Sequence, residues 1–145
     1  MIALLDVNVL VALFDPNHVH HDAAHEWFGA HRAAGWATCP VSENGVVRVL
    51  SNPAYADPPT QPGEVVERLR TFCDSGHHTF WPDDVTLRDA RTFRWDAAVS
   101  FRTLTDMYLV GLADKHHGRL ATFDRSINHK PVVGAERGHV VVIPA

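Results

Sequence analysis

Residues 2–6, Ile2-Ala3-Leu4-Leu5-Asp6, decide the fold class of this 145-residue chain. The first four form a continuous apolar run, which is typical of a strand covered on both faces. Asp6 stands where such a strand would end. Because strands buried on both faces belong to parallel sheets, the chain is expected to open with a buried strand of an α/β fold, with an acid at its carboxyl end.

Later segments alternate between helical and extended patterns. Apolar spacing and cap signals predict helices over 18–34, 42–50, 62–73, 86–93 and 105–118, with Ser42 and Thr105 as N-caps. Further strands are expected at 36–39, 78–81, 120–123 and 140–143. The proline-rich segment 52–62 is expected to be a loop. The pattern predicts an α/β three-layer sandwich, with a central, mainly parallel sheet of about five strands flanked by helices.

Length and composition indicate one domain over residues 1–145. The chain is 46% hydrophobic and 21% charged, which is ordinary for a globular protein. Its net charge of −4 provides no general basic field for nucleic acid, so any such role must rest on a local site. The short apolar start lacks a basic segment and suits neither a signal peptide nor a membrane span, so a cytoplasmic location is expected.

Acidic residues stand repeatedly where strands end or helices begin. In an open parallel sheet, ligands collect at the carboxyl ends of the strands. The acids placed to meet there in one cleft are Asp6, Glu43, Asp106 and Asp124. Clustered carboxylates repel one another, and a hard divalent cation relieves that repulsion. Oxygen-only ligands favour Mg²⁺, with Mn²⁺ as the alternative, and the bound water becomes the candidate nucleophile for a phosphodiester.

Neutral and basic neighbours of these acids are further candidates. Asn8 and Thr122 lie two residues from Asp6 and Asp124, and they could hydrogen-bond to metal ligands or bound water. Arg48 and Arg125 could bind RNA phosphate through the paired donors of the guanidinium group, although each could instead be a surface ion-pair residue.

The order of these motifs resembles a known family. The motifs are Leu4-Leu5-Asp6-Val7-Asn8-Val9-Leu10, Ser42-Glu43-Asn44, Leu104-Thr105-Asp106-Met107-Tyr108-Leu109 and Leu120-Ala121-Thr122-Phe123-Asp124-Arg125. Together they resemble PIN-domain ribonucleases of the VapC toxin type. The resemblance implies a PIN-like fold, Mg²⁺- or Mn²⁺-dependent endoribonuclease activity, a tRNA or rRNA target, homodimerisation and neutralisation by a cognate antitoxin. It assigns the metal-site roles to the same four acids.

Two other functions remain open from the residues alone. A phosphatase with a nucleophilic Asp6 normally has a second Asp two positions on, where this chain has Asn8. A non-catalytic module that binds RNA or protein, with a structural metal, is the second alternative. The His-rich segment 18–25 could hold a transition metal or contact RNA phosphates, but a solvated or hydrogen-bonded helix face is the favoured interpretation.

Overall fold

The computed structural model describes residues 1–97 and 99–145. Strands, α-helices and two short 3₁₀ segments follow one another in the order β1 (Ala3–Leu5), α1 (Val7–Phe14), α2 (His21–His31), η1 (Arg32–Ala34), β2 (Trp36–Thr38), α3 (Pro40–Leu50), α4 (Pro62–Cys73), β3 (His78–Phe80), α5 (Leu104–Lys115), β4 (Arg119–Thr122), η2 (Arg137–His139) and β5 (Val140–Val142). Within the described residues, no helix has both the length and the apolar character needed to cross a membrane.

The five strands form one parallel sheet in the order β3-β2-β1-β4-β5. β1 is the central strand, and Leu4 is in register with Ala37 of β2 on one side and with Leu120 of β4 on the other. The carboxyl ends of β1 and β4 therefore lie next to each other at one edge of the sheet. This arrangement confirms the predicted α/β class with a parallel five-stranded sheet.

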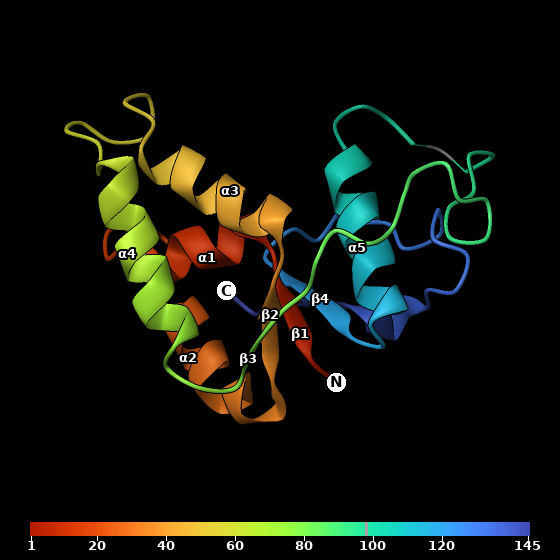
Figure 1. Cartoon of the computed structure of the whole chain (residues 1–145), viewed down its shortest axis with the longest axis horizontal. Coiled ribbons are helices and arrows are strands. Elements are labelled where there is room, and N and C mark those ends of the chain that lie inside the picture. Colours follow the sequence, from red (N-terminus) through yellow and green to blue (C-terminus); the bar gives the residue numbers. More distant parts are fainter. Residues whose placement is uncertain (98) are drawn as a thin grey trace.

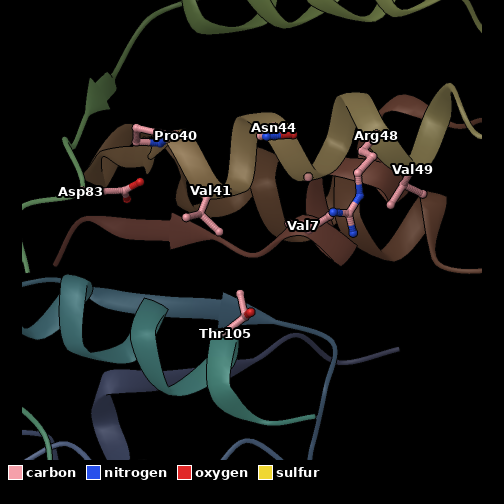
Figure 2. A pocket seen from close by; sticks show the side chains of 9 residues that line it. Val7, Pro40, Val41, Asn44, Arg48, Val49, Asp83 and Thr105 are labelled. Carbon is pink, nitrogen blue, oxygen red and sulfur yellow. The ribbon is translucent and has the colours of Figure 1, made fainter. Parts of the chain in front are cut away.

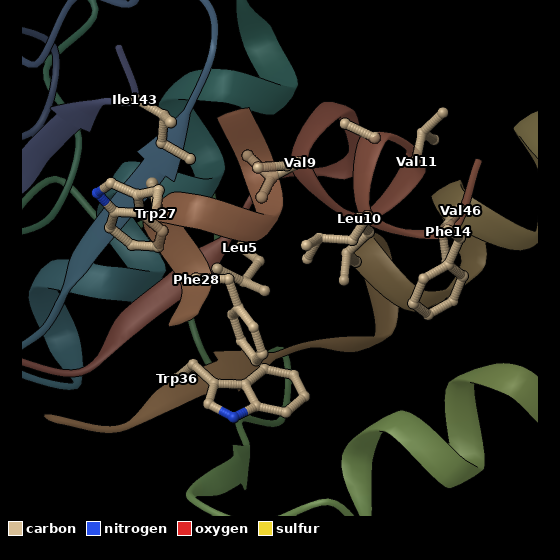
Figure 3. Packing of buried hydrophobic residues seen from close by; sticks show 14 of the residues in the cluster. Leu5, Val9, Leu10, Val11, Phe14, Trp27, Phe28, Trp36, Val46 and Ile143 are labelled. Carbon is tan, nitrogen blue, oxygen red and sulfur yellow. The ribbon is translucent and has the colours of Figure 1, made fainter. Parts of the chain in front are cut away.

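Helices cover both faces of the sheet, which makes three layers (Figure 1). Leu5 packs into a core shared with α1, α2, α3 and α4, where Phe28 and Trp36 meet edge to face at 5.3 Å between ring centroids (Figure 3). Leu4 faces the opposite way and packs into a second core with α5. Alternate residues of β1 thus contribute to different cores, which explains why the strand is apolar throughout.

Helix α1 was not predicted from the sequence. Every residue from Val9 to Phe14 is buried in the structure, so the helix has no polar face to give it a helical period. An apolar run of this kind gives the same pattern whether it forms a buried strand or a buried helix. Asp6 begins the helix as its N-cap, so β1 passes directly into α1 at this acid.

Three local predictions were wrong. Residues 86–93 form turns rather than a helix, although Asp89 N–H does bond to the Thr86 carbonyl. Helix α3 begins after Cys39 rather than Ser42, because Pro40 suits the first helical position and the Ser42 hydroxyl accepts from Cys39 N–H at 3.0 Å. The N-cap of α5 is Thr103 instead of Thr105.

Candidate active site

The Asp6 carboxylate is held by hydrogen bonds on both oxygens. Oδ1 accepts from the Val7 backbone N–H at 2.8 Å, and Oδ2 accepts from the Thr122 hydroxyl at 2.8 Å. The residue is buried, with 7% of its surface exposed. The link between β1 and α1 therefore fixes the position and the orientation of this acid.

Thr122 joins the ends of β1 and β4. Besides donating to Asp6, its hydroxyl oxygen accepts from Asn8 Nδ2 at 3.2 Å and from the Asp124 backbone N–H at 3.0 Å. One donor and two acceptor positions are all that a hydroxyl offers, so its hydrogen-bonding capacity is fully used. Asn8 Oδ1 adds a bond from Phe123 N–H at 3.3 Å. Asn8 and Thr122 thus set the geometry between Asp6 and Asp124.

Asp106 reaches the same place from the first turn of α5. A cavity of about 390 Å³, here called the acid pocket, has the polar lining residues Asp6, Asn8, His18, Tyr55, Asp106 and Asp124. The structure therefore brings together three of the four predicted acids, from three segments far apart in the sequence.

Burial and the charge of neighbouring acids raise the pKa values of Asp6 and Asp106. Burial raises the pKa of Asp106 to about 6, and the nearby carboxylates of Asp6 and Asp124 add to the increase. Burial also raises the pKa of Asp6 above its ordinary value, although the bonds from Thr122 and Val7 oppose the effect. Negative charge at the pocket is thus poorly compensated by the chain itself, which is the condition that a bound cation relieves.

The donor set suits a hydrated divalent cation. All three acids offer carboxylate oxygen, and neither cysteine lines the pocket. Carboxylate donors fit Mg²⁺ or Mn²⁺, because these ions take one or two carboxylates and complete their shells with water and substrate oxygens.

The family model of the PIN domain matches residues 3–133, which is most of the chain. The chain belongs to the PIN-domain family. Ribonuclease VapC39 of Mycobacterium tuberculosis is 46% identical over 127 residues, which cover 88% of this chain and 91% of the relative. Ribonuclease VapC44 of the same organism is 38% identical over 143 residues, covering 99% and 100%, and Ribonuclease VapC38 is 41% identical over 125 residues, covering 86% of each.

In this PIN domain, Glu43 does not join the other three acids. It lies on α3, whose residues Val41, Asn44 and Arg48 line a cavity beside the acid pocket. An α-helix turns by about 100° per residue, which places position 43 about 160° away from Gly45, the position in contact with Val7. The described contacts therefore place Glu43 outside the acid pocket, and its part in a four-acid site stays a prediction.

Glu43 belongs instead to a polar cluster on the other side of α3. The Thr38 hydroxyl donates to Glu43 Oε2 at 2.6 Å and lies 2.7 Å from His78 Nε2. One ligand atom each from Glu43, Cys73 and His78 lie within 4.8 Å of one another, so this group could hold a metal ion. A set of sulfur, nitrogen and oxygen donors suits zinc better than magnesium, so its chemistry differs from that of the acid pocket.

The two predicted arginines have different positions. Arg48 is exposed on α3 and lines the cavity beside the acid pocket, with which that cavity shares Val7 and Val49. Arg125 is exposed next to Asp124, but it is not among the residues that line the acid pocket or the cavity beside it. Arg48 is thus the better placed of the two to contact a substrate.

The His-rich segment has two separate roles in the structure. His21 Nδ1 and His25 Nε2 bond to the carbonyl oxygens of Ala12 and Leu13, at 2.7 and 2.9 Å. These carbonyls belong to the last turn of α1, where a helix has no partners of its own, so the two histidines attach α2 to α1. This agrees with the favoured interpretation of a hydrogen-bonded helix face. His18, in contrast, lines the acid pocket.

Tyr55 lines the acid pocket, although no sequence pattern indicated it as a site residue. It lies in the proline-rich loop and donates from its hydroxyl to Asp15 Oδ2 at 2.5 Å. Burial, together with this bond, raises the pKa of Tyr55 to about 12, so the phenol remains a donor at neutral pH. The bond fastens the loop against the C-terminal end of α1. No periodic signal marks such a contact, because its two residues are 40 positions apart.

Proposed function

We propose that this chain is a metal-dependent endoribonuclease toxin that hydrolyses phosphodiester bonds of RNA, with tRNA or rRNA as the target, as a single PIN domain over residues 1–145. The observation that carries the proposal is the convergence of Asp6, Asp106 and Asp124 in one pocket. The names of the relatives, all of them ribonucleases, support the same substrate class.

Two of the three acids, Asp6 and Asp106, have distinct parts in the proposed site. Asp6 is the rigid ligand, because both of its oxygens are already oriented by Thr122 and Val7. Asp106 is the adjustable ligand, since its first-turn position on α5 and its raised pKa let it exchange a proton as charge enters the pocket. Bound Mg²⁺ would supply a polarised phosphoryl oxygen and an activated water. No nucleophilic side chain is required, so Asn8 in place of a second Asp is no obstacle.

The cation proposed is Mg²⁺, with Mn²⁺ able to replace it. The partners proposed are the RNA substrate, a cognate antitoxin protein that neutralises the activity, and a second copy of this chain in a homodimer. The proposed place of action is the cytoplasm. Membership of the family and the three carboxylates of the acid pocket support these assignments.

Incubation of the purified protein with total cellular RNA tests the proposal. The reactions contain Mg²⁺, Mn²⁺ or EDTA, and new RNA ends are mapped by sequencing. Discrete cuts are expected with either cation and not with EDTA, and Asp6→Asn should abolish them. This variant should fold, since asparagine is as good an N-cap as aspartate. Asp22→Asn, on the exposed side of α2, is the matched control and should cut like the parent.

The alternative functions predict other results. Absence of cutting by folded, antitoxin-free protein under every condition would favour the non-catalytic binding module. A phosphorylated Asp6 trapped on the protein would favour the phosphatase. Either result would overturn the nuclease proposal.

A further inference from the structure

A second cavity lies directly beside the acid pocket, between α3 and the start of α5. Its volume is about 410 Å³, and Figure 2 shows its lining side chains. It shares Val7 and Val49 with the acid pocket, so the two cavities adjoin at these residues. A substrate that extends beyond the acids therefore meets this cavity next.

The charged groups of the cavity lie at opposite ends. Arg48 lies at the end near Val7 and Val49, next to the acid pocket, and Asp83 lies at the far end near Pro40 (Figure 2). A nucleotide has the same polarity, with an anionic phosphate at one end and hydrogen-bonding base edges at the other. The order of charges thus orients a nucleotide with its phosphate near the acids and its base toward Asp83.

The Asp83 carboxylate forms no salt bridge with another described residue. Its neighbour Asp84 is paired with Lys115 and with His116, at 3.4 and 2.9 Å, whereas none of the salt bridges among the described residues includes Asp83. Burial and the nearby Asp83 carboxylate raise the pKa of Tyr108, so this phenol stays protonated beside the acid. Tyr108 can donate to one oxygen of Asp83, but an ionised carboxylate has about four acceptor positions, so Asp83 can still accept bonds from a ligand.

We propose that this cavity binds the nucleotide adjacent to the scissile phosphate and selects guanine. Arg48 contacts the phosphate, and both oxygens of Asp83 accept from the neighbouring N1–H and N2–H₂ groups of the base. Adenine and cytosine place a ring-nitrogen acceptor beside their single amino donor, and uracil flanks its one N–H with two carbonyls. Each of these would set a lone pair against the carboxylate. The inference rests on the proposed ribonuclease function.

Cleavage of a short RNA library, randomised on both sides of the cut, measures this selection. The parent protein should prefer guanine at one flanking position. Asp83→Asn should lower that preference about 10- to 100-fold, the range given by one bidentate contact, and should move it toward adenine, which an amide pairs with well. Asp84→Asn is the control and should leave the preference unchanged. Arg48→Gln should weaken cleavage of all sequences alike.

A binding measurement separates failure of this inference from failure of the ribonuclease proposal. The cleavage-deficient Asp6→Asn protein, with and without Asp83→Asn, is titrated with oligouridylates that carry one G, A or C. Tighter binding of the G-containing RNA that depends on Asp83 would support the subsite even if no RNA were cut. Cleavage whose base preference is the same in Asp83→Asn would overturn the subsite alone. Absence of both cleavage and Asp83-dependent binding would overturn both.

Discussion

The Thr122 hydroxyl and the Asp6 carboxylate, 116 positions apart, form a hydrogen bond of 2.8 Å that is fully buried. Thr122→Val keeps the shape of the side chain but removes the donor. Because Asp6 is buried, the loss leaves one oxygen without a partner and its charged form less stable. Activity should fall about 10- to 100-fold, which is usual when a residue that orients a metal ligand is lost.

Thr122→Ser is the control for this change, since it retains the hydroxyl. The Mg²⁺ concentration needed for half-maximal cleavage should rise in Thr122→Val and stay near the parent value in Thr122→Ser. Equal Mg²⁺ dependence in all three proteins would show that the bond to Asp6 has only a structural role.

Glu43 and Asp124 should respond differently to loss of charge. Asp124→Asn should reduce cleavage at least about 100-fold, because it removes a charge from the acid pocket. Glu43→Gln should retain activity within about threefold, since its carboxylate bonds to Thr38, on the other side of α3, and an amide oxygen can still accept that bond. Initial rates on one RNA substrate at saturating Mg²⁺ decide the matter. Equal losses in the two variants would favour the four-acid site expected from the sequence.

The same apolar pattern gave one correct prediction and one omission. Ile2 to Leu5 was predicted as a strand because it is apolar throughout, and β1 indeed packs into cores on both faces of the sheet. Val9 to Phe14 is apolar for the same reason, but it forms a helix surrounded by other elements. Burial on all sides removes the polar residues that would distinguish a period of two from a period of 3.6.

Positions at strand ends were easier to predict than positions on a helix. Asp6 and Asp124 follow the parallel strands β1 and β4, so the sheet itself brings them together. The direction of the Glu43 side chain depends on which face of α3 contacts α1. The close packing of Gly45 against Val7 determines that face. A contact between two distant segments produces no periodic pattern in the sequence of either segment. No sequence pattern indicated Tyr55 as a pocket residue for a related reason, because the placement of its loop determines its position.

The contribution of Asp106 to the stability of the metal-free protein should fall as pH rises through the range from about 4 to 6. The pKa of Asp106 is 3.8 unfolded and about 6 folded, so the folded state binds more protons within this window and loses stability as they leave. Asp106→Asn removes this penalty. After discounting for solvent screening at this half-buried site, the variant should gain roughly 1 kcal/mol near neutral pH.

Thermal unfolding in EDTA, near pH 5 and near pH 7.5, measures this effect. The stability gained by Asp106→Asn should be larger near pH 7.5. Added Mg²⁺ should then raise the melting temperature of the parent near pH 7.5 but raise that of the variant less, because a ligand stabilises the state that binds it. A stability difference that does not change with pH would contradict the raised pKa.

Gly45 lies where α3 packs closely against Val7 of α1. A Cβ atom at this position would lie 2.5 Å from Val7 Cγ2, well inside contact distance. Gly45→Ala should therefore destabilise the fold by about 1–3 kcal/mol and displace Val7, the neighbour of Asp6, with a loss of activity. Gly29→Ala is the matched control, since nothing lies within 4 Å of its Cβ. In denaturant unfolding the control should gain up to about 1 kcal/mol from helix propensity, so equal stability of the two variants would contradict the close packing.

The histidines of segment 18–25 should separate into structural and pocket residues. His21→Ala and His25→Ala each leave a carbonyl of the last turn of α1 without its partner, so each should cost roughly 1 kcal/mol of unfolding free energy. Their cleavage rates should stay near that of the parent below the melting temperature. His18→Ala removes a side chain that lines the acid pocket, so it should raise the KM for RNA with little change in stability.

Paired measurements of unfolding and of steady-state cleavage on the three variants test this division. Gln at positions 21 and 25 should restore part of the lost stability, because its amide can donate to the same carbonyls. If His18→Ala lowered stability and left KM unchanged, the residue would belong with His21 and His25 as a structural contact, and the acid pocket would bind RNA without it.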